Sequence, residues 1–430
     1  MAAPADHPQT SAEKLIALSI RSTWLLWLVG GLYILGPALG WILGAMAASQ
    51  LYLGKTDSPP GQPGVIGWPL GLWIGGMLAM LVALWIGHTN FALGAGQTIK
   101  STIGWAKGWA LIALFPVACA ILKVRMEVIA RAICQLGGQT LIVLPVFLVA
   151  PYLGLPAELW VSPLRIIGGS GPEYFSATLY TIEPGAGTPR WQFFAPWSPA
   201  AGMVAVIHTV LALQEKSPGW RTVGVLAGVL IAVFSQSRLA LIALLVILPM
   251  LWGLKHIHRP VTWLVASPAA LIAGIFGLPL AEWAEGMIAD VKGARADSTR
   301  VRETLGRIAI ERWQNEAPFF GHGIVENGPH LVEYMPIGSH HSWYGLLFVK
   351  GLFGALALAV PLAITLAVLL LHAARAPIYR TGFGLAAVFL LYSFGENLEM
   401  LAYITWPAWA VLGIALGQVN SERKEKPASL

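Results

Sequence analysis

The chain has 430 residues, of which 56% are hydrophobic and only 11% are charged. A soluble domain carries about 25% charged residues, so this chain lacks the charge that a water-exposed surface requires. This composition excludes a soluble globular enzyme, a disordered chain and a nucleic-acid-binding protein, and it favours a polytopic membrane protein. We therefore attribute the net charge of +6 to Lys and Arg residues in cytoplasmic loops.

Apolar segments long enough to cross a bilayer recur along the whole chain. A spanning helix needs about 20 mostly apolar residues. The first stretch, residues 15–53, is too long for one span, and we predict two short helices with a break near Pro37. The other predicted spans are residues 65–87, 102–122, 134–153, 200–213, 223–234, 239–254, 261–280, 343–371, 382–394 and 401–418. The prediction is an all-α polytopic membrane protein with about twelve transmembrane helices.

Basic residues set the predicted orientation. When both termini are placed on the cytoplasmic side, every cytoplasmic connection is short and basic, as the positive-inside rule requires. Helices 1–9 then occupy residues 1–280, with one outer loop near 154–199. A large outer loop, 281–340, separates helices 9 and 10. Helices 10–12 follow in 341–420, and 421–430 form a cytoplasmic tail.

The large outer loop contains an amphipathic stretch, residues 301–313. Val301, Leu305 and Ile308 lie on one stripe of the predicted helix, and Arg307 is turned away from it. The alternative is a helix that lies on the membrane surface. The loop is therefore predicted to be partly helical.

Arginine stands out among the charges of the predicted outer face. Arg190 precedes a span, Arg238 lies in a tight turn between two spans, and Arg300 and Arg302 lie in the large loop. The guanidinium fork binds phosphate oxygens in pairs, so arginines that converge at one membrane face would suit a pyrophosphate. The alternative for each is a snorkelling side chain or one paired with a carboxylate.

A histidine pair, His340 and His341, directly precedes the apolar segment 343–371. Histidine exchanges a proton near neutral pH, so it suits a general base at a helix start; a structural pair at the membrane interface is the alternative. Adjacent histidines are poor joint ligands, and the chain contains no Asp-x-Asp pair. We predict neither a metal ion nor a cofactor.

Three further charges are candidates to act with this pair. Glu396 and Glu399 fall in a short outer turn, where they would either orient a histidine or be solvated turn acids. Lys350 lies inside an apolar helix about two turns from His341. Charges at that depth are often functional, and snorkelling is the alternative.

Four short motifs follow one another in a fixed order. They are Ser235-Gln236-Ser237-Arg238, Pro318-Phe319-Phe320-Gly321-His322-Gly323, His341-Ser342-Trp343-Tyr344 and Gly351-Leu352-Phe353-Gly354. Their order and placement resemble the O-antigen ligase and polymerase superfamily over residues 185–395. Ser342 replaces the usual Asn of that family, so the choice between His340 and His341 stays open, although the spacing to Tyr344 favours His341. The match to Arg300 or Arg302 is also open.

The resemblance implies a GT-C-like glycosyltransferase of the bacterial inner membrane, with its active site and large loop on the periplasmic side. It would move O-antigen from undecaprenyl pyrophosphate to the lipid A-core acceptor of lipopolysaccharide, with inversion and without a metal. His341 would be the base, supported by His340 and Tyr344. The donor pyrophosphate would bind to Arg190, Arg238, Arg300 and Arg302. The lipid bilayer would be its other partner.

Three alternatives remain. The first is an O-antigen polymerase of the same superfamily, which the sequence distinguishes poorly from a ligase. A protein O-oligosaccharyltransferase usually carries a further C-terminal region. A transporter predicts internal repeats and charges at the membrane midplane, whereas we find no internal repeat here and the unusual charges lie at one face.

Overall fold

The computed structural model describes residues 7–53, 66–168, 171–183, 187–275 and 296–425. The protein is 74% helical and contains almost no sheet. The helices are α1 (Ser11–Arg21), α2 (Thr23–Leu28), α3 (Leu32–Leu53), α4 (Trp68–Asn90), α5 (Gly94–Lys107), α6 (Trp109–Ile121), α7 (Met126–Val149), α8 (Ser198–Ala212), α9 (Pro218–Phe234), α10 (Arg238–His256), α11 (Pro260–Ile275), α13 (Ala296–Glu316), α14 (Ser342–His372), α15 (Pro377–Ser393) and α16 (Leu398–Glu425).

The connection between α7 and α8 holds four short strands. They form two antiparallel pairs, β1 (Glu158–Val161) with β2 (Ser176–Thr178) and β3 (Thr181–Ile182) with β4 (Pro189–Arg190). Short 3-10 helices are η1 (Pro163–Ile167), η2 (Pro172–Tyr174) and η3 (His330–Val332). The predicted outer loop near 154–199 is thus folded rather than a loose connection.

Seven helices of the described chain are long and apolar enough to cross a membrane. They are α3, α4, the joined α5 and α6, α7, α10, α14 and α16, and α8 and α9 are shorter apolar helices. The prediction of a helical, multi-pass membrane protein is confirmed. Parts of the predicted last outer loop (281–295), of the span before it (276–280) and of the tail (426–430) lie outside the described residues.

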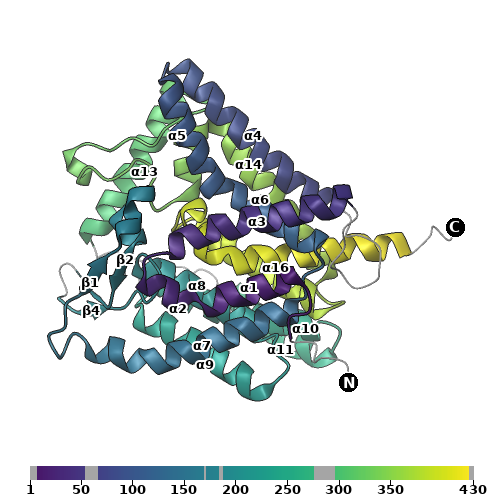
Figure 1. Ribbon diagram of the computed structural model, residues 1–430. Coiled ribbons are helices and arrows are strands. Elements are labelled where there is room, and N and C mark those ends of the chain that lie inside the picture. The colour runs from purple at the N-terminus through teal and green to yellow at the C-terminus, as the bar shows by residue number, and fades with distance from the viewer. Residues whose placement is uncertain (1–6, 54–65, 169–170, 184–186, 276–295, 426–430) are drawn as a thin grey trace.

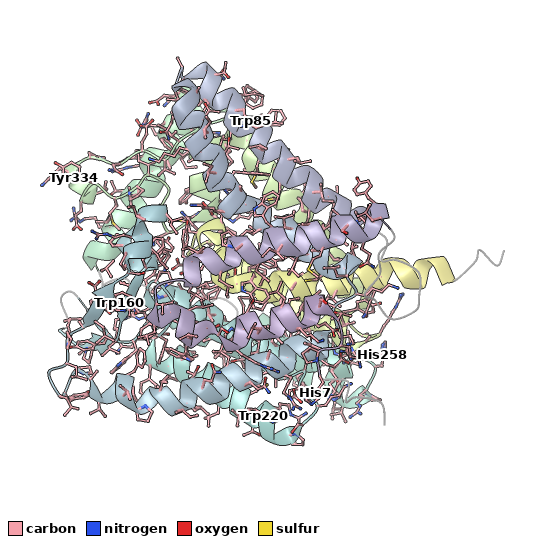
Figure 2. The ribbon with its side chains drawn as sticks, in the orientation of Figure 1. His7, Trp85, Trp160, Trp220, His258 and Tyr334 are labelled. Atoms are coloured by element: carbon pink, nitrogen blue, oxygen red, sulfur yellow. The ribbon has the colours of Figure 1, made fainter. Side chains whose placement is uncertain are left out.

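Different elements form the two ends of the bundle. Figure 1 shows β1, β2, β4 and α13 gathered at one end, whereas α1 begins and α16 ends at the other. Trp160 and Tyr334 lie at the end with the strands, and His7, Trp220 and His258 lie at the opposite end (Figure 2). We call the first the strand end and the second the terminal end.

The predicted break in the first apolar stretch lies elsewhere. The chain breaks between α2 and α3 at residues 29–31, and Pro37 lies inside α3, so the prediction of a break near Pro37 is wrong. Gly30 has φ of +67°, which favours glycine, and a Cβ there would overlap Ser162. The strand region covers the break, because Trp160 Nε1 and Ser162 Oγ each donate a 2.8 Å hydrogen bond to carbonyls of Leu28 and Val29.

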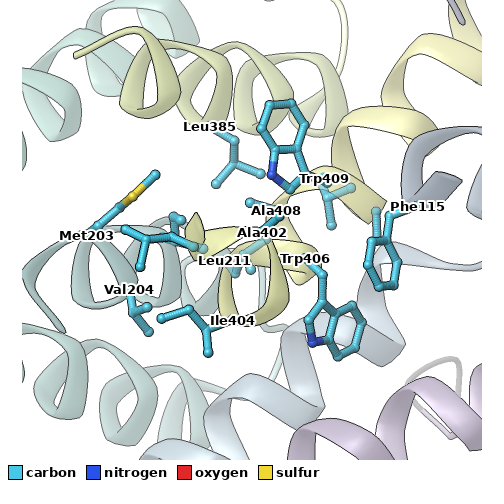
Figure 3. Close-up of a cluster of buried hydrophobic side chains, with 14 of the residues drawn as sticks. Phe115, Met203, Val204, Leu211, Leu385, Ala402, Ile404, Trp406, Ala408 and Trp409 are labelled. Atoms are coloured by element: carbon cyan, nitrogen blue, oxygen red, sulfur yellow. The ribbon is translucent and has the colours of Figure 1, made fainter. Parts of the chain in front are cut away.

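The core surrounds α16, whose residues 401–416 are all buried (Figure 3). The Trp409 ring stacks on Phe389 of α15 with centroids 3.7 Å apart and meets Trp73 of α4 edge-on. One turn earlier, Trp406 stacks on Phe115 of α6. Large aromatic rings fill the contacts of α16 with α15, α4 and α6, so α16 is the central helix of the bundle.

Ion pairs tie together the terminal end. Glu13 of α1 accepts hydrogen bonds of 2.8 and 2.7 Å from the Arg125 guanidinium, and Arg131 binds Glu215 in the same two-bond manner. Glu13 is 1% exposed, and Arg125 is 27% exposed. Removal of one partner from such a pair lowers the stability of the fold, because it leaves a buried charge without its counter-charge.

We expect Glu13→Gln to lower the stability of the detergent-solubilised protein by about 2–3 kcal/mol, because Gln keeps the helix cap but removes the charge facing Arg125. A thermal-unfolding scan measures this loss. The matched control is Lys216→Gln, which breaks the exposed pair with Glu127 and should change stability by about 0.5 kcal/mol or less. Equal midpoints for the two variants would contradict the prediction.

Candidate functional site

The start of α14 is built around His341. His341 is the N-cap, and its Nδ1 accepts a 3.3 Å hydrogen bond from the Tyr344 backbone N–H. The imidazole stacks on the Tyr344 ring, with centroids 3.8 Å apart. Because Nδ1 accepts, the neutral ring carries its proton on Nε2 and presents that nitrogen as a donor. Burial lowers the pKa of His341 to about 4, so the neutral form prevails at pH 7.

The turn between α15 and α16 is bonded to this helix start. The His341 backbone N–H donates to Asn397 Oδ1 (3.0 Å), and the Ser342 hydroxyl donates to the Glu396 carbonyl (2.7 Å). Leu398 N–H then donates to Ser342 Oγ (3.0 Å). Ser342 thus connects the histidine to the turn.

Glu396 is a buried carboxylate within this turn and not the solvated turn acid of the alternative interpretation. It is 1% exposed. Its Oε2 accepts a 2.9 Å hydrogen bond from Trp197 Nε1, and Oε1 has no hydrogen-bond partner among the described residues. Burial raises the pKa of Glu396 to about 7, against the opposing effects of the Trp197 bond and the Arg302 charge.

The turn between α9 and α10 brings Arg190 and Arg238 to the same region. Arg190 Nη2 donates to the Ser235 carbonyl (3.2 Å), so β4 is fixed to this turn. Arg238 begins α10 and is exposed. The Leu239 side chain lies against Gly395, which places the start of α10 beside the Glu396 turn.

The two arginines differ in their environment. The Arg190 guanidinium lies 2.9 Å from a Glu183 carboxylate oxygen, and both side chains are nearly buried, at 12% and 10% exposed. Arg190 is therefore the carboxylate-paired arginine of the alternative interpretation, and its bonds position the turn that carries Arg238. Of the two residues, Arg238 is the exposed one.

Helix α13 supplies the other predicted arginines, Arg300 and Arg302, which are both exposed. The amphipathic helix predicted for 301–313 is present. Its buried face packs on η3 and α14 instead of leaving the bundle, because Gly306 fits directly against the Tyr344 ring. Arg302 interacts electrostatically with both His340 and Glu396. This favours Arg302 over Arg300 as the arginine of the site.

His340 lies beside the site in a strained conformation, with φ of +61°. Burial, followed by the charge of Arg302, lowers the pKa of His340 to about 4. His340 and His341 are therefore both neutral at pH 7.

A break in α14 joins two of the sequence motifs. Gly351 has φ of +62°, and the backbone around it is opened. The residues of the Pro318–Gly323 motif fill this opening: His322 and Gly323 N–H donate 2.9 Å hydrogen bonds to the Phe348 and Val349 carbonyls. Leu352 N–H donates back to the Pro318 carbonyl at 2.9 Å. Because neighbouring backbone satisfies the freed groups, the break is compatible with membrane depth.

His322 anchors this inserted segment. Its Nδ1 lies 3.0 Å from the Phe348 carbonyl and its Nε2 lies 2.7 Å from Glu316 Oε2. This one side chain thus links the inserted segment to both α14 and α13. Glu316 also binds Arg312, and hydrogen bonds from Arg312 and His322 lower the pKa of Glu316 to about 2.

Lys350 and Glu399 form a separate buried group below the site. Lys350 is 5% exposed, and its Nζ lies 5.6 Å from the centre of the Trp109 ring. It interacts electrostatically with Glu399 in the first turn of α16. Lys350 is thus buried and does not snorkel, and Glu399 interacts with it electrostatically.

The described residues contain no group of three or more His, Cys, Asp or Glu side chains that could hold a metal ion. Among the predicted site residues, the structure brings Arg238, Arg302, His340, His341 and Glu396 to one end of the bundle.

Sequence reasoning missed two residues of this site, Trp197 and Asn397. Trp197 lies in a loop 199 residues before the carboxylate that it binds, and no local pattern indicates such a pairing. Asn397 follows the predicted Glu396, and its bond to a helix start could have been suspected from its side chain alone.

Comparison with known proteins adds no family to this description, because no family model and no curated protein sequence matches the chain.

Proposed function

We propose that the chain is an O-antigen ligase, a membrane glycosyltransferase that moves O-antigen from undecaprenyl pyrophosphate to the lipid A-core acceptor. The observation that carries the proposal is the convergence of exposed Arg238 and Arg302 with His341 and buried Glu396 at one end of a multi-pass bundle. Two guanidinium groups beside proton-exchanging side chains suit the transfer of a group away from a pyrophosphate.

The membrane topology supports this proposal. Seven described helices are long and apolar enough to span a bilayer, and α8 and α9 are shorter apolar helices, so we propose the arrangement of about twelve passes that the sequence predicts. The ion-paired terminal end carries the basic connections, so we assign it to the cytoplasm and the strand end to the periplasm. The protein would then be a GT-C-like enzyme of the inner membrane, with its site at the face where a flipped lipid-linked glycan is available.

In the proposed reaction an acceptor hydroxyl attacks the anomeric carbon of the donor, and the pyrophosphate leaves with the electron pair of the broken C–O bond. Arg238 and Arg302 stabilise the charge that develops on the leaving group, and this takes the place of a metal ion. The hydroxyl proton passes to a neighbouring base, for which the sequence predicts His341. Inversion follows from a single displacement.

We expect transfer by the purified protein to be unchanged after exhaustive chelation with EDTA, because guanidinium groups provide the charge that a divalent cation would otherwise supply. The measurement compares initial rates before and after chelation. Loss of activity that added Mg²⁺ restores would contradict the metal-free mechanism.

The cellular test is deletion of the gene, followed by a gel of the lipopolysaccharide. The proposal predicts core-only lipopolysaccharide together with accumulated lipid-linked polymer. Core that carries one repeat unit would instead identify a polymerase, and an unchanged profile would contradict both assignments.

A further inference from the structure

We propose that the Glu396 carboxylate, through Oε1, is the catalytic base that takes the proton from the attacking acceptor hydroxyl. This inference rests on the proposed function and names the residue that performs its proton transfer. In the step, the hydroxyl oxygen forms the new bond to the anomeric carbon, its proton moves to Oε1, and the pyrophosphate leaves with the electrons of the old bond. The proton passes to solvent after the product departs.

The hydrogen bonds of Glu396 make its two oxygens unequal. Oε2 is held by the Trp197 indole at 2.9 Å, whereas Oε1 is buried without a hydrogen-bond partner among the described residues. A buried polar atom without a partner is costly, and such atoms persist where a ligand completes them. A hydroxyl group is the simplest partner for Oε1, because it donates one hydrogen bond and then gives up the same proton.

Glu396 also has the right neighbours. Its carbonyl is bonded to Ser342, next to His341, and Arg302 acts on its charge from α13. Tyr392 of α15 also interacts with it electrostatically. Glu396 therefore belongs to the turn that is bonded to the helix start bearing the histidines, and its carboxylate interacts with an arginine proposed for the pyrophosphate.

His341 is less suited to the same task. Its Nδ1 lone pair accepts from Tyr344 N–H, and the proton of the neutral ring is on Nε2. To accept a proton at Nε2, the ring would have to exchange tautomer and lose its cap bond. Its Nε2–H remains able to donate a hydrogen bond to an oxygen of the donor, and we assign it that role.

Access to Oε1 requires a local movement, because the atom is buried. Apo enzymes often hold catalytic groups in geometry that tightens or opens only with substrate. The proposal therefore includes displacement of side chains over Glu396 when the acceptor binds.

The test is the pH dependence of kcat/KM, measured with purified protein, lipid-linked O-antigen and lipid A-core acceptor. If Glu396 is the base, the rate falls as pH drops below about 7, because the carboxylate becomes protonated. If His341 is the base, the fall occurs only near pH 4. Glu396→Gln should lower the rate by about 10²–10⁴-fold and remove the inflection near pH 7.

Two further variants separate catalysis from structure. Trp197→Phe removes the bond that favours the charged carboxylate, so the inflection should move to higher pH. His341→Asn keeps an N-cap acceptor and should retain the inflection near pH 7. The matched control is Glu333→Gln, an exposed carboxylate of the same loop region, which should leave the profile unchanged.

The outcomes distinguish the two levels of the proposal. A wild-type chain that transfers no glycan contradicts the proposed function. An active wild-type chain whose Glu396→Gln variant keeps the wild-type rate and profile overturns this inference alone, as does an inflection that Trp197→Phe leaves in place.

Discussion

Arg302→Ala is expected to lower glycan transfer by about 10²–10³-fold, the usual cost of removing one group that stabilises a developing negative charge. Arg302 is exposed on α13, and its charge interacts electrostatically with two groups of the site, Glu396 and His340. The loss should appear in kcat, because the leaving group gains charge in the transition state. Initial rates at saturating donor measure it.

A matched control is available on the same helix. Arg307 is also exposed on α13, and five residues of helix turn it to a different side from Arg302. Arg307→Ala should transfer glycan at the wild-type rate, and Arg302→Lys should be intermediate because it keeps the charge but loses the planar fork. Equal rates for Arg302→Ala and Arg307→Ala would remove Arg302 from the mechanism.

Gly351→Ala is expected to prevent stable folding, with a loss of roughly 3–5 kcal/mol from backbone strain and overlap together. Gly351 has φ of +62°, and a Cβ at this position would overlap the Phe319 carbonyl carbon and oxygen. Relief of that overlap would push the inserted 318–323 segment away from α14. The hydrogen bonds that close the helix break would then be lost.

The yield of monodisperse protein and its thermal midpoint in detergent measure this effect. The control is Gly75→Ala on α4, where a Cβ meets no other atom within 4 Å and where alanine favours a helix. This control should be as stable as the wild type. A Gly351→Ala variant with the same midpoint as Gly75→Ala would contradict the account of the broken helix.

The sequence predicts most of the helices because hydropathy and the positions of basic residues are both local signals. The span predicted at 343–371 corresponds to α14, and the amphipathic stretch at 301–313 lies inside α13. The break predicted near Pro37 fails because the actual break depends on a distant partner. Ser162, from the strand region, packs against Gly30 there, and local composition gives no sign of that contact.

The site divides in the same way. Types of residue could be predicted, since arginines and a histidine pair at one face are visible in the sequence. The partners of these residues could not be predicted, because they come together only when the outer loop folds. Glu183 then forms an ion pair with Arg190, and Trp197 donates a hydrogen bond to Glu396. The burial of Glu396 has the same origin, so a side chain expected to support the histidine becomes the best candidate for the base.

Reconstituted transfer tests the central claim most directly. Purified wild-type protein is mixed with undecaprenyl-pyrophosphate-linked O-antigen and lipid A-core acceptor, and the products are separated by size and lipid anchor. The account predicts that the glycan moves to lipid A-core and that undecaprenyl pyrophosphate is released. Donor that stays intact, or donor that lengthens on its own lipid while the acceptor remains unmodified, would contradict it.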